Sequence, residues 1–294
     1  MKFRELGQTG LRTSVLGVGC SRLGSFLSSG SNKEAILMLQ ESLDLGVNYF
    51  DTADSYGQGD SERLLAKAFG GKRDRIILET KAGYCFSQTA RVASRFKQPI
   101  RKFLKSFPTL RGNVEKVRAA HISQRFDSQY LVKALEESLR RLKTDYIDVF
   151  MLHDPPFAIL ENMEYIDIAN RLRDEGKIRS FGVSCRSPDE ALFCMNVPEI
   201  SVIQIPVNSG ERKVLESVLP EAQTKHVGVV ARQPFASGEL NEAKERATEP
   251  ASNENKMLLM RQAVNMALSN SSVSVVLVGM SNRQHLRENI QIIL

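Results

Sequence analysis

The sequence predicts a single α/β domain over residues 1–294, a closed (β/α)8 barrel of the TIM type. Eight short apolar runs alternate with longer helical periods from one end of the chain to the other. The length of 294 residues fits one barrel of this class. With 42% hydrophobic and 25% charged residues, the chain can bury a full core beneath a solvated surface.

The eight runs are nearly continuous in apolar residues, which is typical of strands that are covered on both faces. We expect these strands at Ser14–Gly19, Val47–Asp51, Arg75–Lys81, Tyr146–His153, Ile178–Ser184, Ser201–Ile205, Gly228–Arg232 and Val273–Gly279. Before them, Lys2–Leu6 and Leu11–Thr13 are joined by a turn that begins and ends with glycine. They are expected to form a β-hairpin that caps the bottom of the barrel.

Helical periods fill the intervals between most of these strands. We expect helices from Ser31 to Gly46, from Asp127 to Leu142, from Met163 to Gly176, and over Val214–Ala222, Met257–Leu268 and Asn282–Ile290. Alternation of strands and helices with short connections predicts right-handed βαβ units and a parallel sheet.

An open, doubly wound sheet is the alternative architecture. Its dinucleotide fingerprint would have to be Gly17–Arg22, which lacks the third glycine and has no acidic residue about 20 positions further on. Gly70–Arg73 is not a phosphate-binding P-loop, because the upstream glycine and the Ser or Thr are missing. Two failed fingerprints together with eight strands favour the closed barrel.

The positive charge of the chain belongs to one segment. Residues 86–126, after the third strand, hold ten Lys or Arg and one Glu, a net +9, so the rest of the chain carries −3 of the total +6. A general nucleic-acid-binding surface is therefore not expected. A connection this long is usually functional or disordered, and we interpret it as an inserted loop that forms a substrate lid. The alternative is a solvated basic excursion.

Other classes of protein are disfavoured by what the sequence lacks. The longest apolar run, Ser274–Met280, is far short of a membrane helix, and the N-terminus has no apolar signal segment. The four cysteines form no metal-type cluster, and no two of the four histidines have ligand spacing, so we expect no metal. We expect a cytoplasmic protein with no membrane or nucleic-acid partner.

Four proton-handling side chains follow consecutive strands of the predicted barrel. Asp51 ends the second strand, with Tyr56 five residues on; Lys81 ends the third and His153 the fourth. The carboxyl ends of barrel strands form one rim, where active sites of this fold are built. Each residue has a structural explanation when taken alone, but four at neighbouring strand ends point to a catalytic site.

These residue types suit proton transfer coupled to reduction of a carbonyl. A free tyrosine has a pKa of about 10, too high for ready proton exchange at neutral pH. A nearby ammonium would lower that pKa, and a carboxylate would hold the ammonium in place. A histidine beside them can donate a hydrogen bond that orients the carbonyl oxygen.

Several ordered motifs resemble the signatures of the aldo-keto reductases. They are Asn48–Gly57 (NYFDTADSYG), Glu79–Gly83 (ETKAG), Ser138–Asp148 (SLRRLKTDYID), Leu152-His153, Gly176–Ser184 (GKIRSFGVS) and Gln204–Asn208 (QIPVN). The resemblance extends from the expected hairpin to Glu288-Asn289, apart from the basic insertion. It implies a barrel that uses NAD(P)H, interconverts an aldehyde or ketone with its alcohol, and is commonly monomeric.

The resemblance also implies the roles of individual residues. Tyr56 would be the general acid/base, Lys81 its pKa-lowering partner, Asp51 the support of Lys81, and His153 the carbonyl-orienting donor. Cofactor contacts would fall on Cys20, Asp51, Ser184, Gln204, Arg232, Gln233, Pro234, Phe235, Ser237, Gly279, Ser281, His285, Glu288 and Asn289. We expect NADP as the cofactor, with NAD as the alternative, and a small carbonyl or alcohol as the substrate.

The chain departs from the family pattern at several positions. Cys185 stands where relatives often have Asn, and Arg232 where many stack an aromatic ring on the nicotinamide. Ser281 replaces an Arg that contacts the 2′-phosphate in some members, a role that Arg283 or Arg287 would have to take over. Asp154 follows the histidine where many relatives have Trp. The alternative function is a cofactor-sensing regulatory subunit on the same barrel, since the potassium-channel β subunits are also similar.

Overall fold

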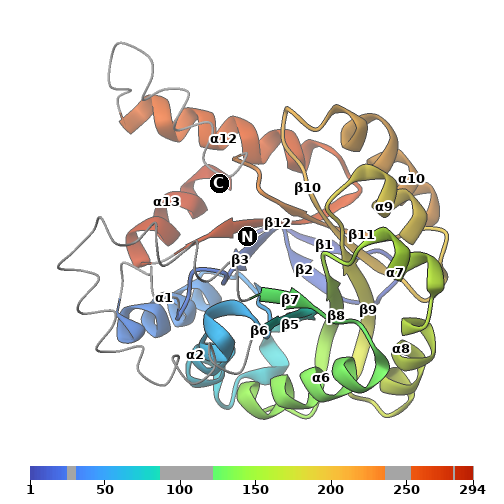
Figure 1. Ribbon diagram of the computed structural model, residues 1–294. Helices are drawn as coiled ribbons and strands as arrows, with labels where there is room; N and C mark the ends of the chain where they lie inside the picture. Colours follow the sequence, from blue (N-terminus) through green and yellow to red (C-terminus); the bar gives the residue numbers. More distant parts are fainter. Residues whose placement is uncertain (25–30, 87–121, 236–252, 281, 294) are drawn as a thin grey trace.

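The computed structural model describes residues 1–24, 31–86, 122–235, 253–280 and 282–293. Eight parallel strands form a closed barrel in the order β3, β4, β5, β8, β9, β10, β11, β12, with β12 pairing back to β3 (Figure 1). Their bounds are β3 Leu16–Gly19, β4 Tyr49–Asp51, β5 Ile77–Ala82, β8 Ile147–His153, β9 Ile178–Ser184, β10 Val202–Pro206, β11 Gly228–Arg232 and β12 Val273–Gly279. All eight expected strands and the (β/α)8 architecture are confirmed.

The N-terminal hairpin is also confirmed. Strands β1 (Phe3–Glu5) and β2 (Arg12–Ser14) pair antiparallel, and the fully buried Leu6 beyond β1 belongs to the same core cluster as interior side chains of the barrel. Gly7 is required at the turn, because it has a φ of +54° and a Cβ there would lie 2.3 Å from the backbone nitrogen of Gly228. The hairpin therefore closes the end of the barrel opposite the predicted rim.

Helices surround the barrel on the outside (Figure 1). They are α1 Asn32–Asp44, α2 Asp60–Phe69, α6 Ser128–Leu142, α7 Phe157–Asn162, α8 Tyr165–Asp174, α9 Pro188–Cys194, α10 Leu219–Lys225, α12 Asn253–Ser269 and α13 Arg283–Ile293. Short helical turns lie at η1 Tyr56–Gly59, η2 Arg73–Arg75 and η4 Val214–Val218, the last of them a π-helix that runs into α10. Helices α2, α7 and α9 were not expected from the sequence.

The two ends of the expected insertion form a second hairpin. Strand β6 (Tyr84–Phe86) pairs antiparallel with β7 (Ile122–Gln124) directly after β5. Arg125 extends the pairing by donating its backbone N–H to the Gly83 carbonyl, at 2.9 Å. Residues 87–121 lie outside the described part of the chain, and with them most of the lid that the sequence analysis predicts.

Alternation along β5 separates the inside of the barrel from its wall. Thr80 faces outward, where its hydroxyl donates to the buried Glu62 carboxylate on α2 at 2.8 Å. Glu79 and Lys81, one position to either side, face the interior and are fully buried. Successive side chains of a strand point to opposite faces, so the two interior residues form consecutive layers beneath the mouth.

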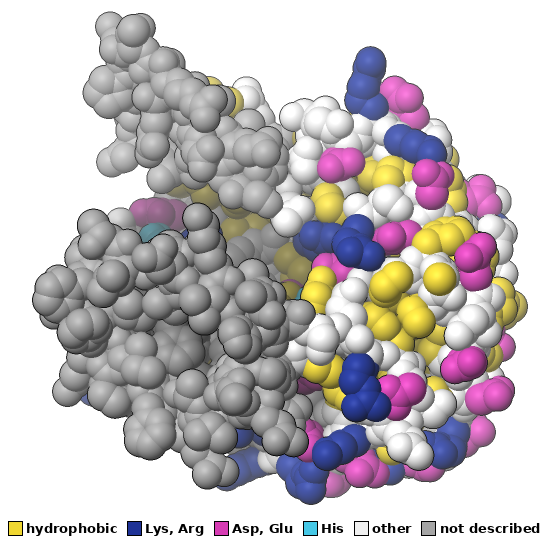
Figure 2. Space-filling model, in the orientation of Figure 1, with side chains coloured by type: hydrophobic (Ala, Val, Ile, Leu, Met, Phe, Trp, Pro, Cys, Tyr) yellow, Lys and Arg dark blue, Asp and Glu magenta, His cyan; other side chains and the backbone are white. Residues whose placement is uncertain are grey.

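The described surface mixes both signs of charge. Figure 2 shows basic and acidic side chains interspersed over the described part of one face. Within the described ranges, no helix is both long enough and apolar enough to cross a bilayer. The same ranges contain no group of three or more His, Cys, Asp or Glu side chains that could hold a metal ion.

Candidate active site

Lys81 lies inside the barrel near the carboxyl end of β5 and is fully buried. Its ammonium donates to Asp51 Oδ1, lies 2.9 Å from Glu79 Oε1, and donates to the Thr52 carbonyl at 3.1 Å. A buried ammonium needs such partners, because removing it from water costs several kcal/mol. Asp51 therefore supports Lys81 as the sequence predicts, and Glu79 adds a second carboxylate that the sequence analysis did not identify.

Tyr56 is positioned by the turn after β4. The turn is tight at Gly57, where φ is +55° and a Cβ would lie 2.9 Å from the backbone of Gly24. The Tyr56 ring faces Lys81, whose Nζ is 5.4 Å from the ring centroid. Its ring centroid lies 5.6 Å from that of His153, with the ring planes nearly perpendicular at 80°. The turn thus brings Tyr56 to the other proton-handling groups.

His153 ends β8 and lies between two tyrosine rings. The Tyr84 ring meets it edge to face at 4.7 Å between centroids, on β6 of the second hairpin. Burial, and then the charges of Lys81 and Arg232, lower the pKa of His153 well below its ordinary value, so the imidazole is neutral. Its buried Nδ1 has no hydrogen-bond partner among the described residues. A neutral imidazole can donate one N–H toward a carbonyl oxygen.

The structure therefore brings together all four residues predicted at the strand ends, and burial acts on the pKa of Tyr56 in the direction opposite to the predicted effect of Lys81. Burial is the main cause that raises the pKa of Tyr56 above its ordinary value, and the charge of Glu79 raises it further. The Lys81 ammonium is shared among Asp51, Glu79 and the Thr52 carbonyl, which limits how far it can lower the pKa of the phenol. Tyr56 is consequently a protonated phenol at neutral pH.

A polar network continues below Lys81 into the barrel. The Glu79 carboxylate accepts hydrogen bonds from the Tyr49 hydroxyl and, at 2.7 Å, from the Gln204 amide. The same Gln204 nitrogen lies 3.4 Å from Asp51 Oδ1. Gln204, a predicted nicotinamide contact on β10, is therefore tied to both carboxylates that hold Lys81.

At the mouth, Asp154 links two residues that the sequence predicts as cofactor contacts. Ser184 donates its hydroxyl to Asp154 Oδ1 at 2.8 Å, and Arg232 Nη2 lies 3.6 Å from the same oxygen. Arg232 also donates to the Cys185 carbonyl at 2.9 Å, while its buried Nε has no partner among the described residues. The Tyr84 hydroxyl reaches the second Asp154 oxygen at 3.4 Å. Asp154 and its partners make the mouth polar, whereas a Trp at position 154 would make it apolar.

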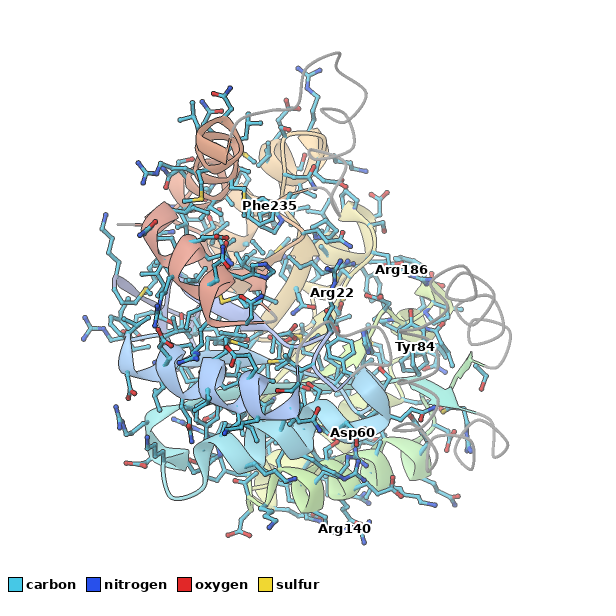
Figure 3. The ribbon with its side chains drawn as sticks, turned by 90° about the vertical axis from the view of Figure 1, so that its left-hand side faces the viewer. Arg22, Asp60, Tyr84, Arg140, Arg186 and Phe235 are labelled. Atoms are coloured by element: carbon cyan, nitrogen blue, oxygen red, sulfur yellow. The ribbon has the colours of Figure 1, made fainter. Side chains whose placement is uncertain are left out.

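The remaining predicted cofactor contacts of this region lie around the same rim. Cys20, after β3, is fully buried and donates its backbone N–H to the Asp51 carbonyl at 2.8 Å. After β11, Gln233 has an unusual left-handed φ of 54°, and its carbonyl accepts from Asn208 at 3.3 Å. Pro234 is buried and Phe235 half-buried. Ser237 lies outside the described residues. Figure 3 labels Phe235 together with Arg22, Tyr84 and Arg186, each of which follows a different barrel strand.

The predicted adenosine contacts gather where β12 leads into α13. Asn289 is buried on α13, and its Oδ1 has no partner among the described residues. Glu288 accepts from Gln284 at 2.9 Å, and His285 donates its backbone N–H to the Asn282 side chain at 2.8 Å. Gly279 ends β12 and is exposed, and a Cβ there would meet nothing within 4 Å. Ser281 lies outside the described residues.

The two arginines that would replace the missing family Arg are already paired with α1. Arg283 donates to Glu34 at 3.1 Å, and Arg287 donates to Glu41 at 2.7 Å. Together with Glu34, Gln284, Glu288 and Gln291 they line a hollow of about 370 Å³ between α1 and α13. Their positive charge is therefore partly neutralised where a 2′-phosphate would need it.

These residues fit a nicotinamide dinucleotide. Buried polar groups without a partner among the described residues lie at both ends of the predicted site, His153 and Arg232 at the mouth and Asn289 on α13. Buried polar groups normally have partners, and a dinucleotide bound along this line would supply them. Gln204 on β10 and Ser184 on the neighbouring β9 carry the amide and hydroxyl groups that a carboxamide would need as partners.

Comparison with known proteins identifies the family. Residues 15–294 match the model of the aldo/keto reductase family. The chain belongs to this family. The chain is 29% identical to L-galactose dehydrogenase of Arabidopsis thaliana, over 99% of this chain and 87% of that protein. It is 32% identical to the aldo-keto reductase YhdN of Bacillus subtilis, over 77% of this chain and 60% of that protein.

Solved structures agree in fold. The holo form of the aldo-keto reductase AKR11C1 from Bacillus halodurans superposes with a TM-score of 0.74 at 28% identity, covering 100% of this chain and 91% of that one. The family membership establishes the chain as an NAD(P)-dependent oxidoreductase that interconverts carbonyl compounds and alcohols.

A buried carboxylate in the Tyr56 turn gives this region a pH-dependent stability. Asp54 Oδ1 is buried without a partner among the described residues, and Oδ2 accepts from the Tyr130 hydroxyl at 3.1 Å. Burial, and then the charge of Glu62, raise the pKa of Asp54 to about 7. The folded protein therefore binds a proton here more tightly than the unfolded chain, and its stability falls as the pH rises from about 4 to about 7.

We expect the substitution Asp54→Asn to remove this dependence. The variant should be more stable than the parent protein by up to about 4 kcal/mol at pH 8, because no charge has to be buried, and the gain should vanish at pH 4. Chemical denaturation at both pH values measures the difference. Asp174→Asn, which changes an exposed carboxylate at the end of α8, is the control. A gain that is equal at both pH values would contradict the assignment.

Proposed function

We propose that the chain reduces a carbonyl group with Tyr56 as the general acid. The observation that carries the proposal is the convergence of Tyr56 and His153, 5.6 Å apart between ring centroids, above the buried Lys81 ammonium. We expect both side chains to bind the same carbonyl oxygen at the mouth of the barrel. A bound reduced nicotinamide would supply the hydride to the carbonyl carbon.

Each side chain then has a distinct task. His153, neutral because it is buried, donates a hydrogen bond that orients the carbonyl oxygen. Tyr56 gives its proton to the same oxygen as negative charge develops on it. The Lys81 ammonium, held by Asp51, stabilises the phenolate that remains. Gln204 and Ser184 would hold the nicotinamide carboxamide.

The protonated state of Tyr56 favours the direction of reduction at neutral pH. Oxidation of an alcohol needs the phenolate as a base, and burial together with Glu79 opposes its formation.

The polar mouth of Asp154, Arg232 and Tyr84 suits a small, hydroxylated substrate better than an aromatic one. The relative L-galactose dehydrogenase is named for such a small, hydroxylated substrate. A monomeric state and a cytoplasmic location stay predictions from the sequence.

We expect Tyr56→Phe to lower kcat for aldehyde reduction by about a thousandfold, because the ring stays in place while the transferable proton is lost. The affinity for NADPH and NADH, measured by nicotinamide fluorescence, should change little. Tyr146→Phe is the control, since it removes the hydroxyl of a tyrosine that precedes β8, at the end of the barrel opposite the mouth. A parent protein that binds the cofactor but reduces no carbonyl compound would instead favour the cofactor-sensing alternative.

The choice between NADP and NAD depends on Arg283 and Arg287. We expect the double substitution Glu34→Gln and Glu41→Gln to tighten NADPH binding by about threefold to tenfold, because it frees both guanidinium groups for the 2′-phosphate. NADH binding should be unaffected, since NADH has no such phosphate. Fluorescence titration with both cofactors measures the ratio of the two dissociation constants. Glu221→Gln, which breaks a helix-surface pair with Lys225, is the control. Equal changes for both cofactors would contradict this role.

A further inference from the structure

Glu79 is a fully buried carboxylate that the proposed chemistry does not use. Three donors from three strands converge on it: the Lys81 ammonium of β5 at 2.9 Å, the Gln204 amide of β10 at 2.7 Å, and the Tyr49 hydroxyl of β4. A charge this deep is costly unless its partners are well placed, since replacing such groups by packed apolar residues is often neutral or stabilising. The layer below it, with Tyr49, Ile77 and Val202, is a hydrophobic cluster. Packing alone does not require a carboxylate here.

Glu79 joins the two parts of the proposed site. Its Oε1 atom contacts Lys81, which acts on Tyr56, and also Gln204, which faces the predicted nicotinamide. Because the Gln204 nitrogen is directed at Glu79 and Asp51, the carbonyl oxygen of this amide is free to point to the other side. The Glu79 carboxylate, which lies one layer below Lys81 in the barrel, thus fixes both the Lys81 ammonium and the Gln204 amide.

We propose that Glu79 is a positioning residue that acts through Lys81 and sets the proton affinity of Tyr56. Asp51 alone would leave the ammonium with one carboxylate and a full positive charge toward the phenol. With Glu79 as a second counterion, the Lys81 site carries a net negative charge, and Tyr56 holds its proton more tightly. This inference rests on the proposed role of Tyr56 as the acid.

Other charged groups face the same space and set the background for this effect. Asp51 on β4 is the first counterion of Lys81, and Asp154 after β8 raises the pKa of Tyr56 in the same sense as Glu79. Arg232 on β11 opposes them, and the buried Cys20 and His153 complete the surroundings. Burial lowers the pKa of Lys81 and raises the pKa of Glu79, while their contact at 2.9 Å favours the charged form of both groups.

Loss of the Glu79 charge shifts the proton loss in the same direction whether Tyr56 or Lys81 loses its proton first. Removing the negative charge of Glu79 makes every neighbouring site bind protons less tightly, so the first proton leaves the pair of Tyr56 and Lys81 at a lower pH. Reduction needs Tyr56 protonated, so in Glu79→Gln the decline of the reduction rate with rising pH begins at a lower pH than in the parent protein. Oxidation needs the phenolate, so in Glu79→Gln the increase of the oxidation rate with rising pH also begins at a lower pH.

The experiment compares the parent protein with Glu79→Gln, which keeps the shape of the side chain and removes its charge. We expect the alkaline limb of kcat for NADPH-dependent reduction of glyceraldehyde, a small hydroxylated aldehyde, to move down by about one pH unit. Glu62→Gln is the matched control, because Glu62 is equally buried but lies outside the barrel wall, bonded to Thr80 and Arg141. It should lower stability and leave the pH profile in place.

A second readout works without turnover. Proteins labelled with [13Cζ]-tyrosine, with the Tyr56 signal assigned from Tyr56→Phe, report the ionisation of that phenol directly by NMR. We expect the signal to titrate at a lower pH in Glu79→Gln than in the parent and in Glu62→Gln. An unchanged Tyr56 titration in a folded Glu79→Gln protein would overturn the inference. A shifted titration with no reductase activity in the parent protein would instead reject the proposed function and keep the electrostatic role of Glu79.

Discussion

The buried Lys81 ammonium is the group around which the upper half of the barrel is arranged. It is fully enclosed, so the free energy of removing it from water has to be offset by Asp51, Glu79 and the Thr52 carbonyl. These partners come from two adjacent strands and the loop that follows β4. Closure of the barrel brings Gln204 from the opposite side to both carboxylates. The proton chemistry at the mouth is therefore supported by the same contacts that hold the interior together.

Above this layer, the side chains are positioned by loops rather than by strands. Tyr56 lies in a turn whose glycine approaches the backbone of Gly24, and Tyr84 belongs to the hairpin that follows β5. Both rings pack edge to face on His153, which itself ends a strand. A rigid interior thus holds the charges, while the loops bring the rings that face the substrate. This division is common in barrel enzymes, where the βα loops carry specificity.

The sequence predicted the architecture well because the barrel strands are buried on both faces and read as unbroken apolar runs. Strand β9 matches its expected bounds, and so do β11 and β12. Helices α7 and α9, of six and seven residues, are too short to show a helical period, although Ser187 and Glu190 form a capping box that was available as a signal. Residues 87–121 and the predicted lid lie outside the described part of the chain.

The candidate site was predictable in position but not in electrostatics. Strand ends gave Asp51, Lys81 and His153, since polar residues there interrupt apolar runs. The competition for the Lys81 ammonium was missed, although Glu79 stands two residues earlier and must share its face. The pairs of Arg283 with Glu34 and of Arg287 with Glu41 join residues about 250 positions apart, so no local pattern could indicate them. Such contacts become visible only when the barrel is closed.

The state of the Lys81 side chain tests this account most directly. NMR of the protein labelled with [15Nζ]-lysine, with the Lys81 signal assigned by Lys81→Arg, follows the titration of this one ammonium. If burial and the Glu79 charge both act on it, the ammonium titrates well below the ordinary value, and Glu79→Gln moves the midpoint further downward. An ordinary lysine titration near 10.5, the same with or without the Glu79 charge, would contradict the account.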